Sequence, residues 1–303
     1  MLGPEPESEA MFPSLIISMR PQQWIKNLLL FGPLIFSMNL FDVTMVTRTA
    51  LAFIVFSLAG SAVYLLNDVV DVEKDKAHPV KRNRPIASGK LPIKIALVFM
   101  AVIGAGSLVL AWDLSQTLAY IIIIYMVNNL FYSFKLKHIV LIDVGSLSLG
   151  FVLRVFAGAA VIGVEASPWL IMCTILLSSF LGFAKRRHEL VLLGENNTNH
   201  RSVLEHYSPH LLDQLILISA ASTVMSYALY TVNGKTVAKF GTTNLIYTVP
   251  FILYGVFRYL FLIHNRKKGG DPAKVLLNDA PMVLNIVVWL SVCVYMVYKG
   301  GQL

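Results

Sequence analysis

The chain has 303 residues, of which 56% are hydrophobic and 14% charged, with a net charge of +8 and a mean hydropathy of +0.67. Soluble domains usually carry about 25% charged residues, so this composition excludes an ordinary soluble protein and indicates a bilayer as solvent. The positive balance points to membrane topology or a polyanionic substrate rather than nucleic acid, and the two cysteines predict neither disulfides nor a metal site.

We expect a disordered tail over residues 1–19, because its start is acidic and rich in proline, and one transmembrane domain over residues 20–303. A helix needs roughly 20 apolar residues to cross a bilayer. The apolar runs predict an all-α bundle of about nine such helices, of which the first is interrupted by Gly32 and Pro33. The runs lie at residues 28–41, 49–66, 95–112, 117–134, 139–163, 168–184, 211–232, 244–263 and 281–298.

Lysine and arginine are concentrated on one side of the predicted bundle. Nineteen of the 25 lie before the first span or in the loops after every second span, at residues 20–26, 74–94, 135–137, 185–201 and 266–274. Loops rich in these residues stay in the cytoplasm. The pattern therefore predicts a multi-pass protein of the inner (plasma) membrane with its N-terminus, its long polar loops and its active site on the cytoplasmic side.

The second predicted span runs into a cluster of acidic and amide side chains. If the helix continues, Tyr64, Asn67, Asp68, Asp71 and Asp75 share one face. Three carboxylates on one face repel one another unless cations neutralise them, and oxygen ligands of this kind suit Mg²⁺. The alternative is an acidic helix end solvated at the interface, but acids there oppose the helix dipole. The pattern predicts Mg²⁺ held by Asn67, Asp68, Asp71 and Asp75.

A basic segment follows directly. It contains Lys81, Arg82 and Arg84 within four positions, and Pro79 and Pro85 restrict its backbone. Arginine makes forked contacts with phosphate, and lysine makes point-charge contacts. Topology alone would explain such a charge run. Its place beside the acidic helix end indicates instead the other half of a metal–phosphate site.

Together the two motifs resemble a known family. Asn67-Asp68-x-x-Asp71-x-x-x-Asp75, followed by Lys81-Arg82-x-Arg84-Pro85-Ile86-Ala87-Ser88-Gly89, resembles the first Asp-rich motif of the UbiA-type intramembrane prenyltransferases, and the nine-helix layout is similar too. The resemblance implies that Asp68, Asp71 and Asp75 are catalytic and hold Mg²⁺ on a diphosphate. It also implies a site that opens to the cytoplasm and to a lipid-filled lateral cavity.

The chain departs from the general family after its sixth predicted span, where a second Asp-rich motif would lie. This chain has Lys185-Arg186-Arg187-His188 there. With Arg20-Pro21-x-Gln23-Trp24-x-Lys26-Asn27 and Tyr132-Ser133-x-x-Leu136-Lys137, the pattern resembles the branch of decaprenyl-phosphate phosphoribosyltransferases. That likeness implies transfer of phosphoribose from 5-phosphoribosyl 1-diphosphate to a polyprenyl (decaprenyl) phosphate, with release of diphosphate, in the synthesis of cell-wall arabinan (arabinogalactan) precursors.

Three phosphate groups would meet at such a site, which accounts for its many cations. Each basic candidate could instead set the membrane topology or contact lipid headgroups. The tyrosine could instead be an aromatic residue at the membrane interface. One arginine lies inside a predicted span and could meet the lipid phosphate or pair structurally. The phosphate-binding candidates are Lys26, Tyr64, Lys81, Arg82, Arg84, Lys135, Lys137, Arg154, Lys185 and Arg186.

Two other functions compete with this interpretation. An aromatic or haem prenyltransferase using a prenyl diphosphate would carry carboxylates after the sixth span, where this chain has bases. A transporter or other lipid-handling protein would carry ionisable residues near mid-bilayer in paired broken helices. Here most charges lie at one membrane face, and the Gly32-Pro33 break has no counterpart. The sequence leaves open whether the chain forms a homo-oligomer.

Overall fold

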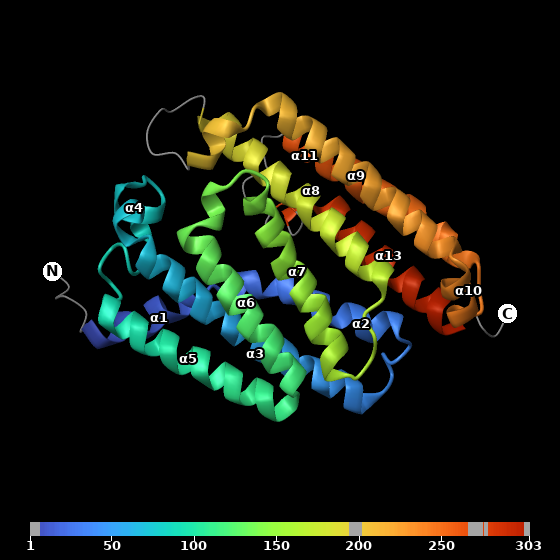
Figure 1. The fold of residues 1–303 in the computed structure, drawn as a ribbon, viewed down its shortest axis with the longest axis horizontal. Helices are drawn as coiled ribbons and strands as arrows, with labels where there is room; N and C mark the ends of the chain where they lie inside the picture. Colours follow the sequence, from blue (N-terminus) through green and yellow to red (C-terminus); the bar gives the residue numbers. More distant parts are fainter. Residues whose placement is uncertain (1–6, 194–201, 266–274, 276–277, 300–303) are drawn as a thin grey trace.

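The computed structural model describes residues 7–193, 202–265, 275 and 278–299. Within these ranges every regular element is a helix (Figure 1), and eight stretches are long and apolar enough to cross a membrane. This confirms the all-α membrane fold, and the eight stretches are candidates for eight of the expected spans. The helices concerned are α3 (Val43–Val70), α5 (Ile93–Leu114), α6 (Gln116–Phe134), α7 (Ile142–Val161), α8 (Pro168–Leu193), α9 (Pro209–Val232), α11 (Val249–Asn265) and α13 (Ala280–Lys299).

The N-terminal segment is helical where a tail was expected. α1 covers Glu7–Met19, and residues 1–6 lie outside the described part of the chain. Met11, Leu15 and Met19 recur every four residues, and they pack against a buried cluster that includes Leu65. This apolar stripe gives the segment a surface to bury, so the expectation of disorder up to residue 19 is wrong for α1.

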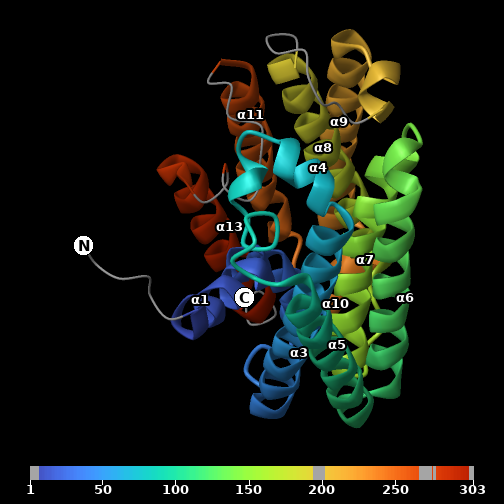
Figure 2. The ribbon, with the colours of Figure 1, turned by 90° about the vertical axis from the view of Figure 1, so that its left-hand side faces the viewer.

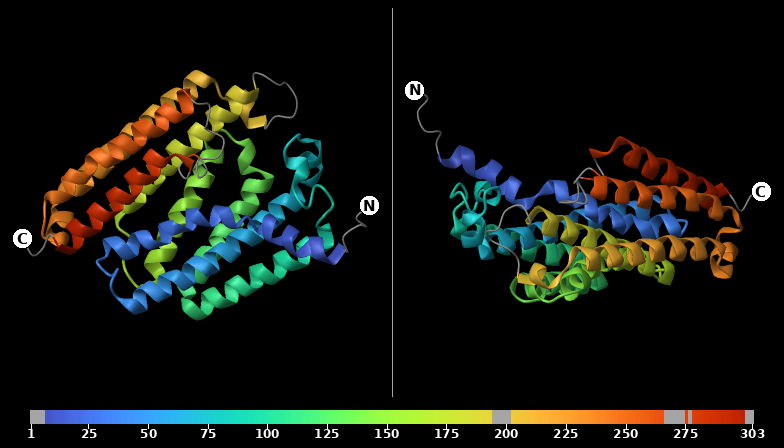
Figure 3. Two further views of the ribbon diagram at one scale, coloured as in Figure 1. Left: turned by 180° about the vertical axis from the view of Figure 1, so that it is seen from behind. Right: turned by 90° about the horizontal axis from the view of Figure 1, so that it is seen from above.

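The first expected span is not one continuous helix. After α1 the chain forms a 3₁₀ helix, η1 (Pro21–Leu30), and then a short helix, α2 (Phe31–Phe36). Pro33 has no N–H to donate to the carbonyl four residues earlier, so an α-helix running through it would lose that bond. Figure 3 shows the α1–η1–α2 segment crossing the bundle, where it contacts α3 and α7.

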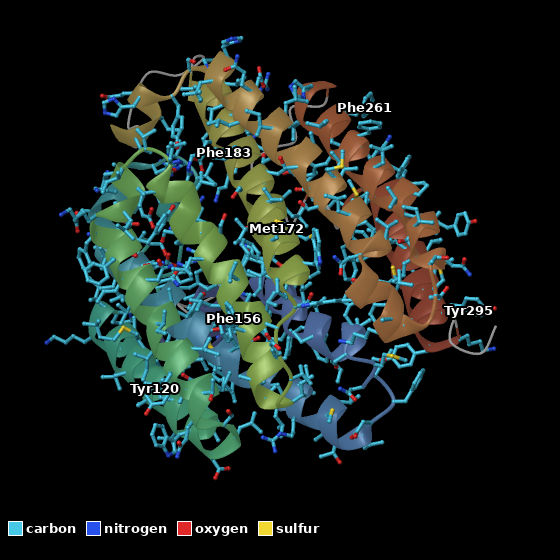
Figure 4. All side chains as sticks on the ribbon, turned by 45° about the vertical axis from the view of Figure 1, so that its right-hand side comes forward. Tyr120, Phe156, Met172, Phe183, Phe261 and Tyr295 are labelled. Atoms are coloured by element: carbon cyan, nitrogen blue, oxygen red, sulfur yellow. The ribbon has the colours of Figure 1, made fainter. Side chains whose placement is uncertain are left out.

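The spanning helices form two groups (Figures 1 and 2). In the first, α3 packs with α5 and α6 with α7; in the second, α8 packs with α9 and α11 with α13. The α7–α8 contact joins the groups. Outside the bundle, large apolar side chains such as Tyr120, Phe261 and Tyr295 are exposed (Figure 4), as expected of a surface covered by lipid.

The short elements that connect the spanning helices lie at the two ends of the bundle. One end carries α4 (Val72–Ala77) and the 3₁₀ helices η2 (Lys81–Asn83), η3 (Leu136–His138) and η4 (Ser202–His206). The other end carries α10 (Gly234–Phe240) and η5 (Asn244–Thr248), as Figure 1 shows for α4 and α10.

The C-terminal helix is bonded to the N-terminal segment at the α10 end. The Tyr298 hydroxyl of α13 accepts the N–H of Leu40 at 2.7 Å and donates to the carbonyl of Ile35 at 3.2 Å. The ring of Phe41 packs edge-on against the Tyr298 ring, with centroids 5.0 Å apart. α13 therefore closes the bundle against the loop that precedes α3.

Candidate active site

The end of α3 and the helix α4 carry the predicted acidic face. α3 ends at Val70 and α4 begins at Val72, with Asp71 between them. Even so, the N–H of Asp71 donates to the Asn67 carbonyl at 2.9 Å, and the N–H of Asp75 donates to the Asp71 carbonyl at 2.8 Å. The four-residue spacing thus continues through the junction, which brings Asp68 and Asp75 to the same cation.

Asp68 and Asp75 are each 3% exposed and share the guanidinium of Arg84. Arg84 Nη1 donates to Asp75 Oδ2 at 2.5 Å and to Asp68 Oδ1 at 3.1 Å. Arg20 Nη2 donates to the same Asp68 oxygen at 2.5 Å. Buried carboxylates carry a large desolvation cost unless cations pair with them. The acidic face and the basic segment therefore form one electrostatic unit.

Arg20 is a member of this unit that the sequence interpretation did not select. It lies directly before η1 with a left-handed backbone (φ 53°, ψ 60°), which is uncommon for a residue other than glycine. Its guanidinium lies 5.0 Å from the centre of the Tyr64 ring. The motif that begins at Arg20 was a usable signal, but nothing in it points to Asp68, 48 residues away.

Asn67 and Asp71 form the more accessible half of the acidic face. Ser133 Oγ, at the end of α6, donates to Asn67 Oδ1, and Lys137 Nζ, in η3, donates to Asp71 Oδ1 at 3.0 Å. The Asp71 side chain is 30% exposed, whereas that of Lys137 is 11% exposed. The α6–η3 turn therefore supplies the second side of the site, as the basic turn after the fourth predicted span suggested.

His78 shapes the turn between α4 and the basic segment. Its Nδ1 accepts the N–H groups of Val80 at 3.1 Å and Lys81 at 3.3 Å. Burial, together with the nearby Lys81 charge, lowers the pKa of His78 below its ordinary value of 6.5. A neutral imidazole with its proton on Nε2 therefore holds the turn that presents Lys81, which is half-buried, and Arg82, which is exposed.

The basic cluster at the end of α8 is engaged with carboxylates. Arg186 is 0% exposed: its Nε donates to Asp143 at 2.6 Å, its Nη1 to Glu189 at 2.6 Å and its Nη2 to the Tyr132 hydroxyl at 3.0 Å. Each of its three nitrogens already bonds to protein. The expectation that Arg186 contacts phosphate is therefore not supported, because the guanidinium is needed to neutralise buried acids. Arg187 likewise pairs with Asp213.

Arg154 is also held by the protein interior. Its Nε donates to Asn27 at 2.6 Å and its Nη1 to the Gly150 carbonyl at 2.6 Å, and its guanidinium lies over three aromatic rings. Asn27 in turn bonds to Ser57, which is eleven residues, or about 16 Å of helix, before Asp68 on α3. Arg154 therefore lies deep in the bundle, away from the acidic face, and the structural alternative fits it better than a phosphate contact.

The remaining predicted residues come from three separate elements. Lys26 on η1 and Lys185 on α8 are half-buried, and Lys135 at the end of α6 is exposed. Phosphate contacts for these three residues stay predictions.

Residues 28–287 match the UbiA prenyltransferase family. The chain belongs to that family. A solved UbiA homologue from Archaeoglobus fulgidus, bound to GPP and Mg²⁺, has the same fold, with a TM-score of 0.70 at 17% identity over 94% of this chain and 99% of the other. This UbiA protein is therefore a multi-pass membrane protein, as its composition predicts.

Two relatives with higher sequence identity to this chain have a more specific description. A decaprenyl-phosphate phosphoribosyltransferase of Corynebacterium glutamicum is 35% identical over 290 residues, which cover 94% of this chain and 86% of that protein. A decaprenyl-phosphate phosphoribosyltransferase of Mycobacterium tuberculosis is 31% identical over 283 residues, which cover 91% and 92% of the two chains.

The oxygen donors of this UbiA site suit a hard cation such as Mg²⁺. Among the described residues, no three His, Cys, Asp or Glu side chains are grouped so that they could hold a metal ion by themselves. Asp68 and Asp75 are instead occupied by guanidinium groups. Mg²⁺ usually takes one or two carboxylates and completes its shell with water and substrate phosphates. Asn67 and Asp71 fit that smaller set, because both lie on the accessible side.

Proposed function

We propose that this protein transfers the 5-phosphoribosyl group of 5-phosphoribosyl 1-diphosphate to decaprenyl phosphate and releases diphosphate. One observation carries the proposal: relatives described as decaprenyl-phosphate phosphoribosyltransferases are 31–35% identical over 91–94% of the chain. The bases that follow the acidic face and lie around η3, namely Lys81, Arg82, Lys135 and Lys137, agree with a site for more than one phosphorylated substrate.

Asn67 and Asp71 would hold the metal against the donor diphosphate. Mg²⁺ bound there would neutralise the charge that builds on the leaving group. Lys137 lies beside Asp71 and is placed to contact the same diphosphate. Asp68 and Asp75 would not touch the metal. They would orient Arg20 and Arg84, whose positive charges would lie near the donor diphosphate.

The other bases are candidates for the 5-phosphate of the donor and the phosphate of the lipid. They are Lys26, Lys81, Arg82, Lys135 and Lys185. In the transfer step an oxygen of the lipid phosphate bonds to C1 of the ribose, while the bond from C1 to the diphosphate breaks and the diphosphate leaves with the electron pair. The lipid phosphate is already ionised, so the step needs no strong general base.

The distribution of lysine and arginine supports an active site on the cytoplasmic side of the inner membrane. The acidic face, the basic segment and η3 all lie at the α4 end of the bundle, together with most of the lysines and arginines in the described part of the chain. The product would be a phosphoribosylated lipid for cell-wall arabinan synthesis.

The proposal is tested with purified protein in detergent, Mg²⁺, 5-phosphoribosyl 1-diphosphate and decaprenyl phosphate. Diphosphate release and the lipid product are followed, the latter by mass spectrometry. We expect a phosphoribosylated lipid that disappears without Mg²⁺ and in Asp71→Asn. Glu73→Gln is the matched control, since Glu73 lies two residues away with a side chain that is 78% exposed and paired only with Lys76 among the ion pairs described.

A folded protein that makes no phosphoribosylated lipid would overturn the proposal. Transfer from a prenyl diphosphate to an aromatic acceptor under the same conditions would assign the protein to the aromatic prenyltransferases. Turnover of neither substrate pair would favour a lipid-handling protein.

A further inference from the structure

A buried network beside the site makes none of the proposed substrate contacts. The side chains of Asp143, at the start of α7, and Arg186, on α8, are 0% exposed, and Tyr207, directly after η4, is 5% exposed. Arg186 Nε donates to Asp143 Oδ2 at 2.6 Å, and the Tyr207 hydroxyl donates to Asp143 Oδ1 at 2.9 Å. One carboxylate therefore ties together α7, α8 and the segment that follows η4.

The same Tyr207 hydroxyl holds the turn before α7. It accepts the N–H of Leu141 at 2.8 Å, and Leu141 has a positive φ of 65° with a ψ of −38°. A leucine in this region is strained and persists only where its surroundings hold it. Val140 adds to that hold by packing against the buried cluster that contains Val203 and Tyr207.

This turn leads directly to the active site. Leu141 lies four residues after Lys137, whose Nζ is 3.0 Å from Asp71 Oδ1. Backbone hydrogen bonds brace the segment that contains both residues: the N–H of Ile139 donates to the Leu136 carbonyl at 3.1 Å, and the N–H of Asp143 donates to the Ile139 carbonyl at 3.0 Å. A shift at Leu141 would therefore be transmitted to Lys137.

The hydroxyl of Tyr207 is suited to both of its contacts. Burial raises the pKa of Tyr207 to about 12, and the neighbouring Asp143 carboxylate also raises it. The hydroxyl thus stays protonated at physiological pH, so it can donate to Asp143 and accept from Leu141 at the same time. Phenylalanine would keep the ring in its cluster but would leave the Leu141 N–H without this acceptor.

We propose that Tyr207 is a positioning residue that fixes Lys137 beside Asp71, through Asp143 and the Leu141 turn. The inference rests on the proposed function, in which Lys137 and Asp71 meet the donor diphosphate. It gives Arg186 a role as well: that cation allows the Asp143 carboxylate to be buried where Tyr207 can reach it.

The test compares Tyr207→Phe with Tyr298→Phe in the full chain, reconstituted in lipid nanodiscs. Tyr298 is a matched control, because its hydroxyl also accepts a backbone N–H and donates to an oxygen, but at the α10 end. Hydrogen exchange reports on the Leu141 amide. The dissociation constant of inorganic diphosphate with Mg²⁺ reports on Lys137 and Asp71 without requiring turnover.

We expect Tyr207→Phe to speed exchange at Leu141 and to weaken diphosphate binding about fivefold, as for the loss of a buried hydrogen bond. In a Lys137→Ala background the same change should weaken binding less than about twofold, because the two residues act through one contact. Tyr298→Phe should change neither readout.

Faster exchange with unchanged diphosphate binding would make Tyr207 purely structural and would overturn the proposal. Unchanged exchange at Leu141, independent effects in the double variant, or wild-type protein that does not bind diphosphate would overturn it too. Binding that responds as expected in a protein that forms no phosphoribosylated lipid would leave Tyr207 in its positioning role and remove only the assigned reaction.

Discussion

Gly158 of α7 lies directly against the backbone of Leu30 in η1: a Cβ atom at position 158 would be 2.0 Å from the Leu30 carbonyl oxygen. The N-terminal segment can approach α7 this closely only because residue 158 has no side chain. Gly158→Ala should lower the free energy of unfolding by about 1–3 kcal/mol, since η1 must move away. Thermal unfolding in detergent measures this loss. Gly106→Ala is the control, because nothing lies within 4 Å of its added Cβ; equal losses in both variants would contradict the close packing.

Arg84 holds two buried carboxylates through a single nitrogen. Arg84→Gln should lower the free energy of unfolding by roughly 2–4 kcal/mol, because Asp68 and Asp75 lose their common cation. The estimate is below that for a fully buried pair because the Arg84 side chain is 29% exposed. Adding Asp75→Asn should restore part of the stability, since Asp68 keeps Arg20. Denaturant titration at neutral pH provides the measurement, and a double variant no more stable than Arg84→Gln would show that Arg84 acts elsewhere.

If Asp71 holds the metal as proposed, it should contribute more to metal binding than to stability. Its pair with Lys137 is partly exposed, and pairs of this kind are worth about 1 kcal/mol or less. Asp71→Asn should therefore leave the melting temperature nearly unchanged while it weakens the apparent Mg²⁺ affinity by roughly 10–100-fold. Mg²⁺ titration of diphosphate binding gives the affinity. A large loss of stability with normal Mg²⁺ affinity would show that Asp71, like Asp68, stabilises the fold and does not bind the metal.

The His78 turn should depend on pH. Because folding lowers the pKa of His78, its contribution to stability is fully present above the unfolded value of 6.5. That contribution is lost as the pH falls below 6.5 toward the folded pKa, where protonated Nδ1 can no longer accept the N–H groups of Val80 and Lys81. Hydrogen exchange of these amides, corrected for intrinsic rates, should show protection falling from pH 7.5 to 5. In His78→Asn, whose side-chain oxygen accepts without titrating, protection should stay level; a parallel fall would remove His78 as the cause.

The local parts of the site could be read from the sequence, because the residues that form them are close in the chain. Asp68, Asp75 and Arg84 span 17 positions, and helical spacing with the following basic turn was enough to bring them together. Arg20 joins them only because α1 and η1 pack across α3. No local spacing encodes that contact, and the acidic start of the chain concealed the apolar stripe of α1.

Arg186 shows a different limit of sequence interpretation. A basic cluster at a membrane interface has the same sequence pattern whether its side chains bind a ligand or pair with buried acids. For Arg186 the deciding residue is Asp143, which lies 43 positions earlier in the chain and accepts from its Nε. The break in the first expected span was visible at Gly32-Pro33, but the close packing of η1 against α7 requires Gly158, which lies more than 120 residues away in the sequence.

The bond between Tyr298 and the loop before α3 has a consequence for biogenesis. During synthesis α2 and α3 enter the membrane long before α13 emerges from the ribosome, so the Leu40 N–H must use water or a temporary partner until the bundle closes. Chains whose synthesis ends before codon 298 would lack the Tyr298 hydroxyl, so the loop before α3 would lose its hydrogen bonds to α13. Such chains should be recognised by membrane proteases at the α10 end, on the face opposite to the acidic cluster.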